Sequence, residues 1–221
     1  NRDQIHVTTI DIEVQSDEGF PEPDKANFPV ISISTKSSKE SFYRVWGLGE
    51  FAPEQDTVYV KCESELQLID TFLKYWNGHG MPDVVTGWNI KGFDIPYLVN
   101  RTRKVLGEES VKKWSIWGLV SSRVVRGKMG MKDIDTYDLA GIAQLDYYDL
   151  FRKFTLNTLG QQESYRLDQI ANVVLGERKL SYDEHGNLHT LYKNDHQKFI
   201  EYNIKDVELV DKLEQKLGLI T

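Results

Sequence analysis

The sequence predicts a mixed α/β domain, and three observations carry that prediction. Residues 7–14 are rich in β-branched side chains, as is typical of a strand. Apolar residues recur at helical spacing in 63–76 and again in 93–106. Strand-like and helix-like stretches alternate over all 221 residues without an internal repeat or an interdomain linker. We therefore expect a single domain that spans residues 1–221.

The first half of the chain is expected to supply most of the sheet. Its strands are predicted at 7–14, 30–35, 41–46, 57–61 and 84–88, and its helices at 63–76 and 93–106. The second and third strands are expected to pair antiparallel across the turn at 36–40. Ser64 is the expected N-cap of the first helix, and Gly107 closes the second, because glycine is favoured just after a helix end.

The second half adds a hairpin and further helices. Strands at 119–125 and 131–137 flank the basic segment 126–130, which predicts an inserted β-hairpin with an exposed tip. Helices are expected at 138–154, 166–175 and 196–213, with a polar loop at 180–191. Asp195 is the expected cap of the last helix.

Composition narrows the class of protein. No apolar run approaches the roughly 20 residues of a membrane helix and no signal peptide is visible, so no membrane partner is expected. The single cysteine, Cys62, excludes an intrachain disulfide and fits a reducing compartment. The net charge of −7 does not suggest a nucleic-acid binder, but cations bound at an acidic site reverse the local charge. Because Asn1 stands directly ahead of the first strand, we expect a piece of a longer protein.

Asp11 and Glu13 in the first strand are the first candidate site. Side chains two apart on a strand share a face, so these carboxylates project together while Ile10 and Ile12 point into a core. Partly desolvated like charges repel each other, and a divalent cation relieves that repulsion. The alternative is an edge strand with a hydrated acidic face.

Two further polar pairs accompany them. Asn89 and Asp94 follow the short strand at 84–88, and the end of a strand is a usual place for a site. The alternative for Asp94 is a helix N-terminal residue favoured by the helix dipole. Tyr202 and Asp206 are four residues apart on the last helix and share a face beside its apolar stripe. Their alternative is a hydrogen bond between the two side chains on the helix surface.

These motifs carry a family resemblance. Asp-Ile-Glu at 11–13, Asn-x-x-x-Phe-Asp at 89–94 and Tyr-x-x-x-Asp at 202–206 resemble the exonuclease motifs of the DnaQ-like superfamily. Their order and spacing are similar to those of the proofreading domain of family B DNA polymerases. The strings at 86–97 and 145–151 resemble the replicative polymerases of T-even-like tailed phages. The resemblance spans nearly the whole chain. It implies an RNase H-like mixed sheet flanked by helices, and a 3′→5′ exonuclease that hydrolyses the terminal phosphodiester of single-stranded or frayed DNA.

The resemblance also implies the chemistry of the site. Ligands that are all oxygen suit two Mg²⁺ or Mn²⁺ ions, which together activate water and neutralise the leaving 3′ oxygen. Asp11 is then expected to bridge both ions, with Glu13 and Asp206 on the ion that activates water. Asp94 is expected to hold the ion near the leaving oxygen. Tyr202 orients the attacking water, because a phenol of pKa about 10 is a poor base at neutral pH.

Other residues are expected to contact the substrate. Asn89 and Phe93 shape the pocket for the terminal nucleotide, although a core role for Phe93 stays open. Arg126 and Lys128 resemble the tip of the strand-separating hairpin of family B polymerases, with an ordinary surface hairpin as the alternative. Basic residues that either track phosphates or line a solvated helix face are Arg101, Arg103, Lys104, Lys112 and Lys113.

Four further residues are not expected to take part in the site. Trp114 and Trp117 are expected in the core rather than stacked on bases, and Asp146 and Asp149 are expected to cap, pair or face solvent. The implied partners are a single-stranded DNA 3′ end and the polymerase domains of the same polypeptide. The isolated domain is expected to be a monomer, working as a phage protein in the cytoplasm of the bacterial host.

Two alternatives to a proofreading domain stay open. A free-standing DnaQ-like exonuclease on RNA or small nucleic acids does not account for the extra hairpin or the abrupt start. A catalytically inactive module that binds DNA or a polymerase would not need all four carboxylates. No polymerase motif such as Asp-Thr-Asp-Ser occurs, so DNA synthesis is not expected in this chain.

Overall fold

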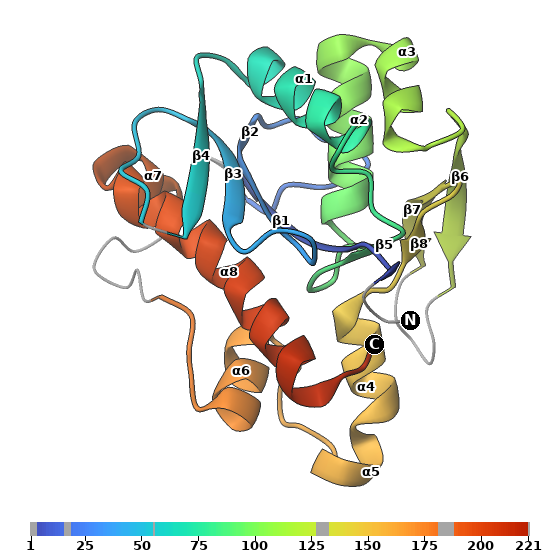
Figure 1. The fold of residues 1–221 in the computed structure, drawn as a ribbon, viewed down its shortest axis with the longest axis vertical. Helices are drawn as coiled ribbons and strands as arrows, with labels where there is room; N and C mark the ends of the chain where they lie inside the picture. The colour runs from blue at the N-terminus through green and yellow to red at the C-terminus, as the bar shows by residue number, and fades with distance from the viewer. Residues whose placement is uncertain (1–3, 16–18, 55, 127–132, 181–187, 221) are drawn as a thin grey trace.

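A computed structural model of the chain describes residues 4–15, 19–54, 56–126, 133–180 and 188–220. Six of its strands form one sheet in the order β4-β3-β2-β1-β5-β8. Their bounds are β1 Val7–Val14, β2 Val30–Ser37, β3 Tyr43–Leu48, β4 Thr57–Cys62, β5 Val84–Thr86 and β8 Ala143–Gln144. β2 is antiparallel to β1 and β3, whereas the other neighbouring pairs are parallel. The sheet is therefore mixed and mostly parallel, with β1 in its interior (Figure 1).

Helices cover both faces of this sheet. They are α1 Glu65–Trp76, α2 Asp94–Leu106, α3 Glu108–Val111, α4 Tyr147–Phe154, α5 Leu156–Leu159, α6 Leu167–Leu175, α7 Leu188–Asn194 and α8 His196–Leu217. Ile10 and Ile12 of β1 join the main core with α1 and α2 on one face. On the other face α8 crosses the strands, and its Phe199 and Ile200 pack on Ile31 of β2 (Figure 1). In the part of the chain that the structure describes, no helix is both long and apolar enough to cross a membrane.

A second apolar core joins α8 to the helices outside the sheet. Tyr147 and Phe151 of α4 pack with Ile170 of α6 and with Leu209 and Leu213 near the end of α8. The first half of α8 therefore belongs to the sheet and its second half to this helical core. Such anchoring at both ends fixes the middle of α8 over the strands (Figure 1).

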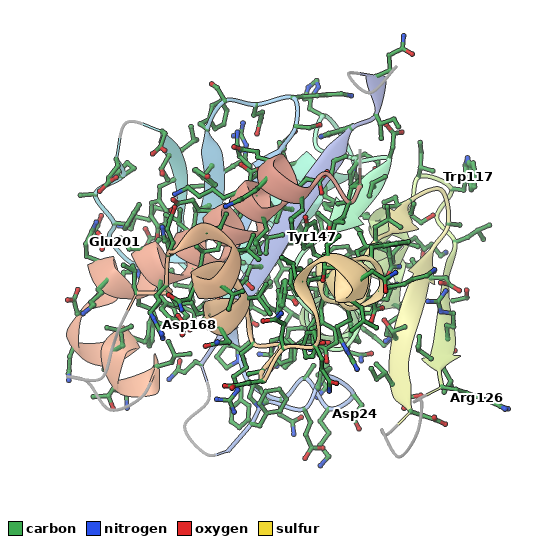
Figure 2. The ribbon with its side chains drawn as sticks, turned by 90° about the horizontal axis from the view of Figure 1, so that it is seen from below. Asp24, Trp117, Arg126, Tyr147, Asp168 and Glu201 are labelled. Carbon is green, nitrogen blue, oxygen red and sulfur yellow. The ribbon has the colours of Figure 1, made fainter. Side chains whose placement is uncertain are left out.

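The predicted hairpin is confirmed, as a two-stranded sheet of its own. β6 (Val120–Val125) and β7 (Ile134–Leu139) pair antiparallel. The hairpin stands beside the main sheet, with Trp117 near one end and the exposed Arg126 at the other (Figure 2). Lys128 and the rest of the predicted tip at 127–130 lie outside the described residues.

Periodicity located most elements correctly; the short helices α3 and α5 were not predicted, α8 continues past the predicted end at 213, and three predicted segments differ more strongly. The helix predicted at 138–154 is wrong over 138–146, because β7 continues to Leu139 and β8 pairs with β5. Leu139 and Ile142 are spaced as on one face of a helix. They lie instead in a turn, in which the Ile142 N–H donates a hydrogen bond to the Leu139 carbonyl. The strand predicted at 84–88 ends at Thr86, and α7 begins at Leu188 inside the predicted loop, whose residues 181–187 lie outside the described part.

Candidate metal centre

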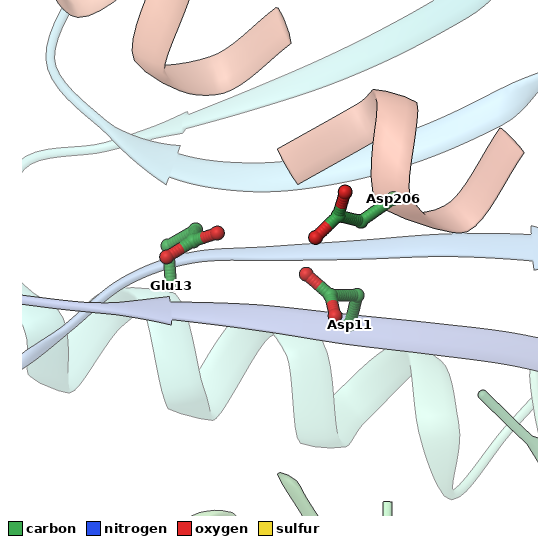
Figure 3. A group of neighbouring side chains, drawn as sticks. All are labelled: Asp11, Glu13 and Asp206. Carbon is green, nitrogen blue, oxygen red and sulfur yellow. The ribbon is translucent and has the colours of Figure 1, made fainter. Parts of the chain in front are cut away.

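Asp11, Glu13 and Asp206 form an acidic cluster between β1 and α8. Each offers one carboxylate oxygen, and these oxygens lie within 4.8 Å of one another (Figure 3). β1 supplies two of them because residues two apart share a strand face. Asp206 meets them because α8 packs across that face. The alternative of a hydrated edge strand is wrong, since β1 has a paired neighbour on each side.

The cluster is electrostatically strained in the absence of a cation. Burial raises the pKa of Asp11 well above its ordinary value, and the charges of Asp206, Asp94 and Glu13 raise it further. Burial, followed by the charge of Asp206, raises the pKa of Glu13 to about 8. Ionised carboxylates are therefore unfavourable here, and a positive charge between them stabilises the ionised state.

Lys179 already supplies one such charge. Its ammonium group donates hydrogen bonds to Asp206 Oδ2 and, over 3.3 Å, to the hydroxyl of Tyr202. Burial alone would lower the pKa of Lys179, but the charge of Asp206, helped by that of Asp11, outweighs burial and raises it. Lys179 was missed at the sequence level, because it follows α6 in an irregular segment whose spacing to the three motifs has no period.

The residues present fit a bound divalent cation. Asp206 Oδ1 is buried and has no hydrogen-bond partner among the described residues. A buried carboxylate oxygen without a partner is costly, and a metal ion would satisfy it. All the donors of Asp11, Glu13 and Asp206 are carboxylate oxygens, which suit Mg²⁺ or Mn²⁺ rather than Zn²⁺.

Asp94 lies beside this cluster rather than in it. It opens α2, is buried, and its Oδ1 accepts the backbone N–H of Ile12 at 3.1 Å. Burial raises its pKa to about 7, and its charge is felt at Asp11. The structure therefore brings three of the four predicted carboxylates within 4.8 Å and holds the fourth nearby by a bond to β1.

The loop before Asp94 is held by Asp146, which was expected only to cap, pair or face solvent. Asp146 is buried, and its two oxygens accept the backbone N–H groups of Asn89 and Lys91, both at 2.9 Å. It also caps α4 by accepting the N–H of Tyr148. Asn89 has a φ of 68°, in the left-handed region, which asparagine adopts more readily than most residues other than glycine. Asp146 thus holds this turn at the edge of the site.

An aromatic pair lies next to Asp94. The ring of Phe93 lies 5.5 Å from that of Phe20 and 5.5 Å from that of Tyr97. Phe20 is 74% exposed, although it is a large apolar side chain. The exposed ring of Phe20, tilted by 52° against that of Phe93, offers a flat surface to a planar ligand. Phe20 was not foreseen, because a single aromatic residue in a Pro-rich loop has no distinctive pattern.

The five basic residues proposed to track phosphates are each paired within the domain. Arg101 makes a two-point ion pair with Glu65, with distances of 2.6 and 2.7 Å. Arg103 pairs with Glu108 at 2.5 Å. The other three pairs are Lys104 with the Asn27 side chain, Lys112 with Glu109 and Lys113 with Asp70. These contacts favour the alternative of an ordinary helix face.

The two tryptophans differ from each other. Trp114 is fully buried and packs on Phe72 and Trp76, which confirms its core role. Trp117 is 69% exposed, so the core role expected for it is wrong. It lies three residues beyond the short helical turn that buries Trp114, where the chain turns outward to the hairpin.

Comparison with known proteins agrees with the acidic site that the geometry shows. The family model for the exonuclease domain of DNA polymerase family B matches residues 1–170. The DNA-directed DNA polymerase of Escherichia phage RB69 is 33% identical over 98% of this chain and 26% of its own length. That of Enterobacteria phage T4 is 31% identical over 100% of this chain and 26% of its own. The DNA polymerase delta catalytic subunit of Bos taurus is 32% identical over 79% of this chain. The chain spans about a quarter of the length of the phage relatives.

Proposed function

The chain belongs to the exonuclease domains of family B DNA polymerases, and we propose that it cleaves DNA from the 3′ end as the proofreading part of a longer polymerase. The observation that carries the proposal is the convergence of Asp11, Glu13 and Asp206, with one buried Asp206 oxygen lacking a partner in the described part. We assign the mixed sheet to the RNase H-like fold. The other domains of the polypeptide are its proposed partners, and the cytoplasm of an infected bacterium is its proposed place of action.

The chemistry proposed for the site divides between the cations and the protein. Two bound Mg²⁺ or Mn²⁺ ions would supply charge neutralisation and a reactive water. Asp11, Glu13 and Asp206 would hold them, and Asp94 would contribute from the start of α2. These carboxylates must lose their protons to bind a cation, so burial that raises their pKa also makes binding depend on pH.

Two residues near the carboxylates are proposed to act on water and phosphate. Tyr202 is buried, its hydroxyl faces the ammonium group of Lys179, and burial raises its pKa. Its phenol therefore stays protonated and orients water by hydrogen bonding rather than acting as a base. Lys179 carries a positive charge beside Asp206, where it can attract the phosphate of the substrate.

The terminal nucleotide is proposed to lie beside the Asn89–Asp94 turn. The rings of Phe93 and Phe20 offer stacking surfaces that tolerate any base, as proofreading requires. Asn89 is held in place by Asp146 and is proposed to contact the sugar or base. Arg126 and Lys128 remain candidates for separating strands, with Lys128 outside the described residues.

The test is degradation of 5′-labelled single-stranded DNA. Wild-type protein should shorten the strand from its 3′ end with Mg²⁺ or Mn²⁺, and a chelator should abolish the reaction. Asp11→Ala should lower the rate by more than about 100-fold, as loss of a central electrostatic partner does. Asp70→Ala is the matched control, because Asp70 lies on α1, away from the cluster, and pairs with Lys74.

Three results would contradict the proposal. Equal activity of wild type and Asp11→Ala would remove the acidic cluster from the reaction. Shortening from the 5′ end would refute the proposed direction. Cleavage of RNA far faster than DNA would favour a free-standing exonuclease with another substrate.

A further inference from the structure

A buried amide on α8 binds Asp11 directly. Asn203 is fully buried and follows Tyr202 in the sequence. Its Nδ2 donates a hydrogen bond to Asp11 Oδ2 at 2.7 Å. Its Oδ1 accepts hydrogen bonds from the hydroxyls of Ser32 at 2.9 Å and Ser34 at 2.5 Å. The amide therefore connects α8, β1 and β2 at one point.

The two serines and the carboxylate of Asp11 together determine which way this amide faces. On β2, Ser34 lies opposite Asp11 and Ser32 lies opposite Glu13 in the antiparallel register with β1. Both hydroxyls donate to the same oxygen of Asn203, and this leaves its NH₂ group directed at Asp11. Ser32 and Ser34 are fully buried and Asp11 is half-buried, and a missing hydrogen bond is costly at buried groups. A reversed amide would place its oxygen against the acceptor-only carboxylate of Asp11, and the two serine hydroxyls would have to change from donors to acceptors.

We propose that Asn203, oriented by Ser32 and Ser34, is a positioning residue for the metal centre and sets its affinity for divalent cations. It fixes the plane of the Asp11 carboxylate before a cation binds. Cation binding therefore loses less conformational entropy, because this ligand is already ordered. This inference rests on the proposed function, because it takes the acidic cluster to be a metal centre.

The expected size of the effect follows from the behaviour of groups that hydrogen-bond metal ligands. Loss of one such partner typically weakens metal binding about 10–100-fold. An amide that only filled space between β2 and α8 would affect the free energy of unfolding but not the affinity for metal. Metal affinity, measured apart from catalysis, therefore separates the two roles.

The experiment is a Mn²⁺ titration followed by electron paramagnetic resonance, without DNA. Asn203→Ala should raise the Mn²⁺ concentration at half-saturation about 10–100-fold. Asn100→Ala is the matched control: Asn100 also donates from Nδ2 to one oxygen and accepts two donors at Oδ1, from Arg103 and Tyr137, away from the cluster. It should leave the affinity for Mn²⁺ unchanged.

A second variant covers the case in which Asn203→Ala does not fold. Ser32→Ala combined with Ser34→Ala keeps Asn203 but removes the two donors that orient it, so it should also weaken Mn²⁺ binding. Binding within twofold of wild type in a folded variant would overturn the inference while leaving the proposed function intact. If wild-type protein itself binds no Mn²⁺, the proposed function and this inference fall together.

Discussion

Around Asp11, the protein holds carboxylates closer together than their charges favour. Burial and mutual repulsion raise the pKa of Asp11, Glu13 and Asp94, and Lys179 offsets part of the repulsion through Asp206. The single positive charge of Lys179 does not balance these carboxylates. Asp206 Oδ1 still lacks a hydrogen-bond partner in the described part of the chain. The electrostatic repulsion between these carboxylates therefore also favours the binding of a cation, which relieves it.

Tyr202 provides a test that separates catalysis from metal binding. Its hydroxyl contacts Lys179, so Tyr202→Phe should keep the carboxylates intact. We expect cleavage to slow by about 10-fold or more, with Mn²⁺ affinity unchanged, because the change removes the hydroxyl that we propose orients water. Single-turnover rates and Mn²⁺ titrations would be compared with those of Tyr59→Phe, which removes a tyrosine hydroxyl bonded to Gly49 away from the cluster. Unchanged cleavage would exclude Tyr202 from the mechanism.

Local rules explain which site residues the sequence revealed. A period of two placed Asp11 and Glu13 on one face, and a spacing of four placed Tyr202 and Asp206 together on α8. Lys179 obeys no such rule: it reaches Asp206 only because the folded chain returns there after α6. Side chains brought in by tertiary folding from irregular segments carry no periodic signal.

Among the elements, α8 is essential to the acidic cluster because it carries Asp206. Its first half packs on β2 and its second half packs with α4 and α6, so the position of Asp206 over β1 depends on both cores. Trp88, which follows β5, extends the second core by packing near Phe151 of α4. The helical core therefore supports both α8 and the turn that carries Asn89.

Two phenylalanines on α4 test how far the domain depends on the second apolar core for its stability. Phe151 is fully buried in the second core, whereas Phe154 on the same helix is 54% exposed. Phe151→Ala should lower the free energy of unfolding by about 3–5 kcal/mol, because it leaves a cavity. Phe154→Ala should change it by less than about 0.5 kcal/mol. Urea denaturation measures both, and similar losses in the two variants would show that the helical core does not depend on Phe151.

Element prediction succeeded where one periodic pattern was uninterrupted. α1, α2 and α6 were located to within a residue or two from apolar spacing and their flanking residues. The failure at 138–146 has a different origin, because β8 forms only by pairing with β5, far away in the sequence. A two-residue strand has too few side chains to show a period of its own.

At the scale of the whole molecule, the charge of the site affects the stability of the domain. Glu13 has an ordinary pKa of 4.5 and a pKa of about 8 in the folded chain; Asp94 moves from 3.8 to about 7. Between these limits the folded protein holds protons that the unfolded chain has released, so the free energy of unfolding falls as pH rises. The histidines His6 and His196, whose pKa values are lowered by burial, act in the opposite direction near pH 6.5 and below. The range from about pH 7 to 8 therefore isolates the carboxylates.

With chelator present, we expect the free energy of unfolding, measured by urea denaturation, to fall between about pH 7 and 8, by up to about 1.4 kcal/mol per pH unit for each group still titrating. With saturating Mg²⁺ the trend should reverse, because the cation binds the ionised carboxylates and its stabilisation grows as they lose protons. Glu13→Gln is the control: residue 13 can then no longer ionise, so the curve in chelator should become less steep, with Asp11 and Asp94 still titrating, and the gain from Mg²⁺ should shrink. Parallel curves with and without Mg²⁺ would mean that the cluster does not bind the ion, however closely its oxygens converge.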